Sequence, residues 1–148
     1  MRQIQTKFFG IKEIDEKQII RFPIGLPGFE HSHNFILLKV EDSVFSCLQS
    51  VDKVETAFVL ISPFEICSDY HFNLDENTIS RLEINAPGEV EVLSIVVIPN
   101  GKMNEATANL QAPIVINKNK MLGQQTILVD TDYPLRLPIW ESNSLVAK

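Results

Sequence analysis

The residues of this chain whose types and spacing could support metal chemistry are its three histidines. His31 and His33 stand two positions apart, so on a strand their rings would share one face, and His71 could supply a third ligand. No cysteine lies near the pair, and the surrounding residues are polar. We therefore expect the two neighbouring histidines to lie in a surface loop, and the chain to bind no metal.

Paired carboxylates are the second group that could do chemistry. The pairs are Glu41/Asp42, Asp75/Glu76 and Asp130/Asp132. A catalytic pair needs a cleft that perturbs its pKa, whereas turns and helix starts favour acidic residues for their own hydrogen bonding. The sequence contains no phosphate-binding glycine loop, nucleophile elbow or zinc-protease motif. It predicts a protein that is not an enzyme and needs no cofactor.

Amide side chains mark the most distinctive stretch of the chain, residues 107–117. Asn109, Gln111 and Asn117 are interleaved with apolar residues around Pro113. Amides donate and accept hydrogen bonds, but they supply no nucleophile and bind metals poorly. This composition favours a segment that holds a partner over one that transforms a substrate. Phe64 and Ile66 fit either the core or a docking patch.

Composition and charge narrow the class of partner. The chain has 148 residues, which fits one domain, and a net charge of −6 that opposes binding to phosphate backbones but suits a basic protein. Lys118 and Lys120 could contact nucleic acid, so the alternative function is that of a small β-barrel that binds nucleic acid. No apolar run approaches the roughly 20 residues that span a membrane. Cys47 and Cys67 form no disulfide pattern, so we expect core thiols in a cytoplasmic protein.

Short strands dominate the predicted secondary structure. Alternation predicts a first strand over residues 4–8 that ends at Gly10. Asn73 and Glu76 resemble a capping box, which predicts a helix over 74–83. Residues 118–123 read as a hairpin loop with Gly123 in the left-handed conformation. The other predicted strands are 18–22, 35–40, 44–50, 57–62, 90–98, 106–111, 114–117 and 125–129.

This density of short strands and turns favours an antiparallel sheet. We therefore predict a mostly β fold, a small antiparallel barrel-like or sandwich domain with one or two short helices. A single domain covers residues 1–140, and residues 141–148 form a frayed C-terminal tail. We expect the protein to be a monomer.

Several segments together resemble the FliW family, the flagellar assembly factors. They occur in the order and spacing of that family: residues 22–29, 48–50 and 57–59, Pro63 with Asp69 and Tyr70, and residues 107–117 with Gly123 and Gln124. The resemblance extends from about residue 4 to residue 133, and residues 107–114 are its most specific part. The family pattern does not depend on the histidines or the cysteines.

The resemblance implies a cytoplasmic regulator with two alternative protein partners. FliW-like proteins bind flagellin before its export, and they bind CsrA, a small basic RNA-binding dimer that represses translation of flagellin. When flagellin accumulates, it occupies the FliW-like protein and CsrA is free to repress. When flagellin is exported, the FliW-like protein binds CsrA and lifts repression. A chaperone role toward unassembled flagellin is also implied.

Polar and aromatic side chains inside the matched segments are the predicted partner contacts. They are Phe29, Gln49, Asp69, Tyr70, Asn109, Gln111 and Asn117. Because buried amides commonly satisfy backbone groups, a structural role remains the alternative for each of them.

Overall fold

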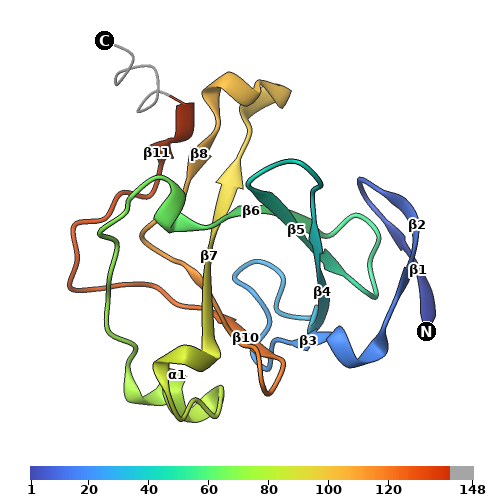
Figure 1. Ribbon diagram of the computed structural model, residues 1–148, viewed down its shortest axis with the longest axis horizontal. Coiled ribbons are helices and arrows are strands. Elements are labelled where there is room, and N and C mark those ends of the chain that lie inside the picture. Colours follow the sequence, from blue (N-terminus) through green and yellow to red (C-terminus); the bar gives the residue numbers. More distant parts are fainter. Residues whose placement is uncertain (141–148) are drawn as a thin grey trace.

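The structure is a computed structural model that describes residues 1–140 and is mostly β (Figure 1). Its strands are β1 (Arg2–Thr6), β2 (Gly10–Ile14), β3 (Ile20–Arg21), β4 (Asn34–Lys39), β5 (Phe45–Ser50), β6 (Ala57–Ile61), β7 (Val90–Val97), β8 (Thr107–Ala108), β9 (Ile114–Asn117), β10 (Leu122–Gln125) and β11 (Leu137–Pro138). One α-helix, α1 (Glu76–Arg81), accompanies five short 3-10 helices in this part of the chain. The predicted tail, 141–148, lies outside the described residues.

A closed barrel forms the centre of the molecule. The large sheet runs in the order β11-β8-β7-β6-β5-β4-β3-β10-β9, and β7 also pairs with β9. That additional pairing joins the two ends of a seven-stranded run, so the barrel leaves no open edge there. All pairings are antiparallel except the one between β10 and β3. The predicted barrel-like fold is confirmed.

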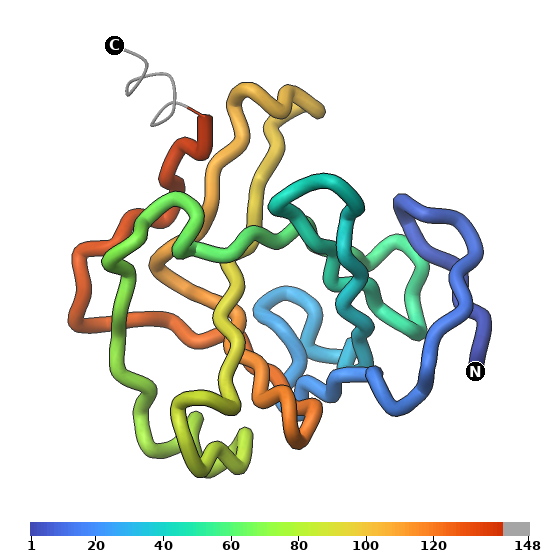
Figure 2. The backbone as a smooth tube through the Cα atoms, in the orientation of Figure 1, coloured from blue at the N-terminus to red at the C-terminus, as the bar shows by residue number. Residues whose placement is uncertain are grey.

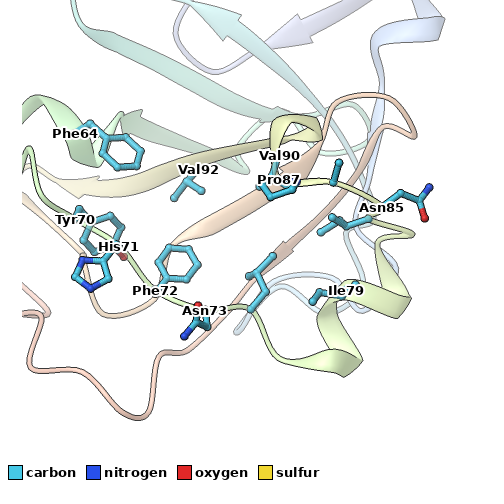
Figure 3. A pocket seen from close by; sticks show the side chains of 13 residues that line it. Phe64, Tyr70, His71, Phe72, Asn73, Ile79, Asn85, Pro87, Val90 and Val92 are labelled. Atoms are coloured by element: carbon cyan, nitrogen blue, oxygen red, sulfur yellow. The ribbon is translucent and has the colours of Figure 1, made fainter.

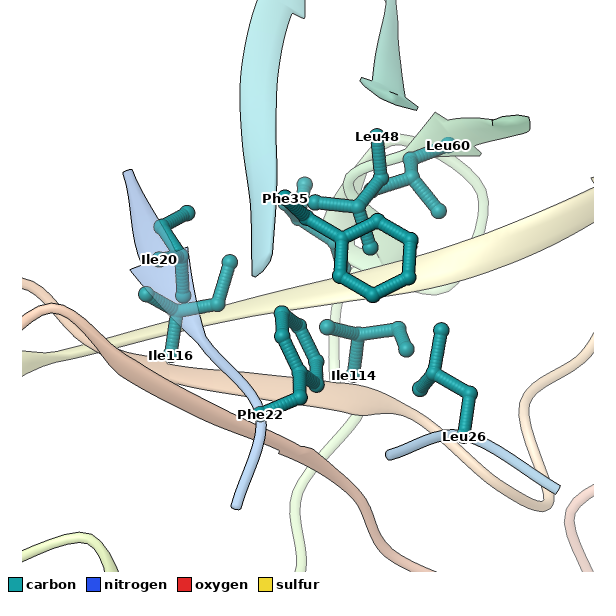
Figure 4. Packing of buried hydrophobic residues seen from close by; sticks show 9 residues of the cluster. Ile20, Phe22, Leu26, Phe35, Leu48, Leu60, Ile114 and Ile116 are labelled. Carbon is teal, nitrogen blue, oxygen red and sulfur yellow. The ribbon is translucent and has the colours of Figure 1, made fainter. Parts of the chain in front are cut away.

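The barrel interior is filled by apolar side chains from strands that are far apart in the sequence (Figure 4). The cluster consists of Ile20, Phe22, Leu26, Phe35, Leu48, Leu60, Leu93, Ile114 and Ile116. The rings of Phe22 and Phe35 meet edge to face, with their centroids 5.2 Å apart. Each fully buried side chain of this size contributes about 1.5–3 kcal/mol to folding. This cluster is therefore the main source of stability for the surfaces around it.

Gly123 is required inside a strand rather than in a turn. A Cβ atom at this position would lie 2.6 Å from Cζ of Phe22, so any other residue would force the Phe22 ring to move. The expectation of a left-handed Gly123 was wrong, because Met121 takes that conformation (φ 55°) and β10 begins directly after it. The return strand consequently spans Leu122–Gln125 instead of residues 125–129.

The N-terminal hairpin stands beside the barrel as a separate two-stranded sheet (Figure 2). Gly10, with φ +67°, turns the chain and starts β2, so it does not simply end a strand. The predicted strand at 18–22 is reduced to β3, because residues Glu16–Gln18 form a 3-10 helix. Only the last residue of β2 is buried, so the sequence carries no apolar alternation that could have revealed the strand.

Two further boundaries differ from expectation for local reasons. The cap of α1 is Asp75, whose Oδ1 accepts a hydrogen bond from the backbone N–H of Thr78 at 2.7 Å, and not Asn73. The predicted strand at 106–111 stops after Ala108, because Oδ1 of Asn109 accepts hydrogen bonds from the backbone and turns the chain. Elsewhere, β4 to β7 and β9 match the predicted strands to within one residue at each end.

Candidate functional site

The segment between β6 and β7 leaves the barrel and crosses its outer face (Figure 1). Pro63 ends the sheet pairing of β6, and the 3-10 helix Pro63–Glu65 follows, capped by the Ser62 side chain. An extended stretch, α1 and a second 3-10 helix (Pro87–Glu89) then lead into β7. Residues 62–89 therefore form a layer outside the closed sheet.

A small aromatic cluster fixes one part of this outer layer. The Tyr70 ring lies 4.5 Å from that of Tyr133, 5.5 Å from that of Phe72 and 6.0 Å from that of Phe64, measured between centroids. Tyr70 is buried, and its hydroxyl donates a hydrogen bond to the carbonyl oxygen of Leu110 at 2.7 Å. Burial raises the pKa of Tyr70, so the hydroxyl keeps its proton and remains a donor.

The outer layer encloses an apolar groove of about 580 Å³ (Figure 3). Phe64, Tyr70 and Phe72 lie on one side of this groove, and Ile79 and Pro87 lie on the other. Ile84 and, from β7, Val90 and Val92 also line it. Phe64 is 50% exposed and Ile79 is 36% exposed, which is unusual for large apolar side chains that surround one cavity. A contiguous exposed apolar surface of this kind is typical of a binding site.

Negative charge is concentrated in the segment that builds the groove. Residues 62–92 hold seven acidic residues and one basic residue, Arg81. The guanidinium of Arg81 donates a hydrogen bond to Oε1 of Gln124 at 2.8 Å. Of the seven carboxylates, Glu83 pairs with Lys120 at 3.7 Å. The segment that builds the groove is therefore strongly acidic, although its carboxylates are not among the residues that line the groove.

Two of these carboxylates accept hydrogen bonds within the fold, and these bonds lower their pKa values. Hydrogen bonds from the backbone and side chain of Thr78 lower the pKa of Asp75, and a hydrogen bond from the backbone N–H of Asn85 lowers that of Glu89. Both groups are at the surface and stay ionised. Such shifts stabilise turns and helix starts, and they do not create an acid or a base for catalysis.

Three of the predicted contact residues are buried and hydrogen-bonded within the fold. Oε1 of Gln49 accepts a hydrogen bond from the backbone N–H of Lys7, and its Nε2 donates to backbone carbonyls in the β5–β6 turn. Nδ2 of Asn117 donates to the carbonyl oxygen of Leu82 at 2.7 Å, at the end of α1. The hydroxyl of Tyr70 donates to the carbonyl oxygen of Leu110. Their side chains join distant segments of backbone.

The other predicted residues are partly or fully exposed and lie in two regions. Asp69 is next to Tyr70, and its Oδ1 accepts a hydrogen bond from Sγ of Cys67. Gln111 is exposed at the turn that Asn109 makes behind the aromatic wall. Phe29 is 42% exposed and packs its ring on Phe58 of β6, with centroids 5.2 Å apart. Of the seven predicted contact residues, Tyr70 is the one that lines the groove.

Most groove residues were not singled out from the sequence. The sequence left Phe64 undecided between a core position and a docking patch. The structure places it on the groove wall, where it is half exposed. Phe72, Ile84, Pro87 and Val92 were missed. The available signal was the recurrence of apolar residues between closely spaced acidic ones over 62–92. That pattern has neither a helical nor a strand period, so periodicity could not detect it.

The histidines lie in separate environments. Nδ1 of His33 is 2.8 Å from the carbonyl oxygen of Phe22, and Nδ1 of His71 is 3.0 Å from that of Asp69. Among residues 1–140, no group of three or more His, Cys, Asp or Glu side chains is arranged to hold a metal ion. Within the same residues, no helix has the length and apolar character needed to cross a membrane.

Known proteins resemble this chain over nearly its whole length. The family model described as "FliW protein" matches residues 3–139. The flagellar assembly factor FliW of Caldicellulosiruptor saccharolyticus is 42% identical over 146 residues, which is 98% of this chain and 95% of that protein. The flagellar assembly factor FliW of Bacillus licheniformis is 47% identical over 137 residues, 92% of this chain and 95% of that protein.

A solved structure resembles this chain in both fold and sequence. A crystal structure of the flagellar assembly factor FliW superposes with a TM-score of 0.86 and 43% sequence identity, covering 93% of this chain and 96% of that one. The matched region includes the barrel, the outer layer and residues 107–117. This chain therefore belongs to the FliW family of flagellar assembly factors.

Proposed function

We propose that this chain is a non-enzymatic cytoplasmic regulator that binds flagellin and, as an alternative partner, the translational repressor CsrA. While flagellin occupies the chain before export, CsrA is free and represses translation of flagellin. After export, the chain binds CsrA and lifts that repression. The same binding shields unassembled flagellin, which is a chaperone function.

The observation that carries this proposal is the apolar groove whose walls belong to the acidic segment 62–92. Phe64 and Ile79 are exposed there, where a partner can contact them, and the segment has a net negative charge. An acidic surface attracts a basic protein such as CsrA and raises the rate of encounter more than the affinity. The groove combines this charge with apolar area, which supplies the binding energy.

A switch between two partners requires no conformational change in the chain. If flagellin and CsrA exclude each other, the concentration of free flagellin alone determines how much of the chain remains for CsrA. The fixed hydrogen bonds of Tyr70, Gln49 and Asn117 fit a rigid binding protein of this kind. Rigid surfaces bind with less loss of conformational entropy than mobile ones.

Titration of the full chain against each partner and against both together tests the proposal. Calorimetry should give binding to flagellin alone and to CsrA alone, and size-exclusion chromatography with light scattering should give two binary complexes. With all three proteins present, added flagellin should displace CsrA. The proposal fails if neither folded partner binds. A ternary complex would refute mutual exclusion. A mobility shift of flagellin leader RNA without CsrA would favour direct nucleic-acid binding instead.

A further inference from the structure

We propose that the groove between Phe64 and Ile79 takes an amphipathic α-helix whose polar face is basic. This inference rests on the proposed docking function and specifies the form and charge of the partner segment. It follows from three properties of the groove, namely what its floor presents, how its walls are fixed and which charges surround it.

The floor of the groove presents side chains rather than free backbone. Residues Val90–Leu93 pair with β9, and successive side chains on a strand point to opposite faces. Leu93 belongs to the barrel core, whereas Val92 packs against the Tyr70 cluster on the outer face. A partner in the groove therefore meets valine and aromatic side chains. That surface suits the apolar stripe of a helix better than the backbone of an added strand.

The walls are apolar, partly exposed and rigid. Phe64 and Ile79 remain 50% and 36% exposed, and the groove has room for several side chains in its volume of about 580 Å³. An amphipathic helix offers anchors at positions i, i+3 or i+4, and i+7 along one face. The aromatic wall is held by the hydrogen bond from Tyr70 to Leu110, so the groove exists before a partner arrives.

The surroundings favour a helix with positive charge. Residues 62–92 hold seven carboxylates, and Glu65 and Glu76 are exposed on elements that form opposite walls. The only basic residue of this segment, Arg81, is hydrogen-bonded to Gln124. A basic polar face gains favourable charge interactions on both sides of the groove, whereas an acidic face is repelled.

Designed peptides of about 18 residues, roughly five helical turns, test this directly with the full-length chain. The probe is a fluorescein-labelled peptide of leucine and lysine, with leucines at i, i+3, i+4 and i+7. Controls are the same peptide with glutamate for lysine, a scrambled peptide and a peptide with a central proline. Fluorescence anisotropy should show binding of the probe, binding at least about tenfold weaker for the scrambled and proline peptides, and none for the acidic one.

Matched variants locate the binding to the groove. Phe64→Gln and Ile79→Gln should each weaken binding of the basic peptide about tenfold, because each removes an apolar contact. Ile127→Gln is the control, since Ile127 is 64% exposed and does not line the groove. Circular dichroism confirms that all three variants fold. Equal binding of the scrambled peptide, or equal loss in the Ile127 variant, overturns the inference.

A second pair of variants tests the charge. Glu65→Gln combined with Glu76→Gln should weaken binding and reduce its dependence on salt concentration. Glu41→Gln combined with Glu55→Gln makes the same change in net charge at exposed positions outside the groove, and it should have a smaller effect. Identical effects of the two pairs would mean that net charge, and not the groove, attracts the peptide.

Parallel titrations with flagellin and CsrA separate this inference from the proposed function. If both proteins bind the unaltered chain but Phe64→Gln and Ile79→Gln bind them equally well, the groove assignment fails and the regulatory function stands. If the peptide binds in the groove while neither protein binds the chain, the regulatory function fails and the preference for a basic helix stands. If the same variants lose binding of the peptide and also of flagellin or CsrA, both the groove assignment and the regulatory function are supported.

Discussion

The hydroxyl of Tyr70 and the carbonyl oxygen of Leu110 lie 2.7 Å apart and join two segments that are 40 residues apart in the chain. Tyr70 belongs to the aromatic wall of the groove, and Leu110 lies in the middle of residues 107–117. The amide-rich stretch therefore supports the groove from behind. Changes at either residue should alter the stability of the outer layer before they alter the barrel.

Replacing Tyr70 by phenylalanine should lower the free energy of unfolding by about 1–2 kcal/mol, because a buried carbonyl loses its donor. The aromatic ring remains, so the apolar wall should be retained. Urea unfolding followed by circular dichroism measures the loss. Tyr133→Phe is the matched control, since the Tyr133 hydroxyl accepts a hydrogen bond from the exposed backbone N–H of His71. Equal losses in both variants would contradict the special role of the buried bond.

Gln49→Ala and Asn117→Ala should each lower the free energy of unfolding by about 2–4 kcal/mol. Each amide holds several backbone groups, and removing it leaves buried donors and acceptors unpaired. Gln111→Ala, at an exposed amide of the same region, should change the value by less than about 0.5 kcal/mol. Thermal melting of the three variants checks the order. A melting temperature that is unchanged in Gln49→Ala would instead favour a role in partner contact.

Gly123→Ala should destabilise the protein by about 1–3 kcal/mol through overpacking against the Phe22 ring. Phe22→Leu replaces the ring by a smaller side chain and should partly relieve the clash. The double variant should therefore be more stable than the sum of the two single losses by at least about 1 kcal/mol. A double-mutant cycle in urea measures this coupling. Strict additivity would contradict the close approach to Phe22 as the reason for a glycine at position 123.

The two cysteines should differ in reactivity toward iodoacetamide. Burial raises the pKa of Cys47 to about 11, and this thiol is 2% exposed, so it should stay unmodified in the folded protein. Burial and the neighbouring Asp69 also raise the pKa of Cys67, but this side chain is more accessible and should react slowly at pH 8 and faster at pH 9. Mass spectrometry of alkylated peptides distinguishes them. Modification of Cys47 at the same rate as Cys67 would contradict the burial.

The raised pKa of Cys47 also has a consequence for stability. Its contribution is fully present below the ordinary value of 9.0 and is lost as the pH rises toward about 11, because the folded state holds the proton more tightly than the unfolded state. Cys47→Ala should therefore reduce the fall in stability between pH 9 and pH 11. Urea unfolding of both proteins at these two pH values provides the comparison.

The sequence alone was sufficient for features that depend on neighbouring residues. Apolar runs bounded by turn residues located β4 to β7. Asn100 and Gly101, a pair typical of turns, both have positive φ. Residues 107–117 indicated the family, because an interleaved amide pattern of this length is specific. The charge and the absence of reactive motifs favoured a binding protein over an enzyme.

Only the tertiary structure decided which polar residues are buried and where the groove lies. Gln49 and Asn117 are residue types that commonly form surface contacts. In this fold, however, their side chains are buried and hydrogen-bond to the backbone of Lys7 and Leu82. The groove joins Phe64, Ile79 and Val92 from three different elements. Local sequence patterns report the period of a single element, whereas burial depends on contacts between distant elements that form only when the barrel closes.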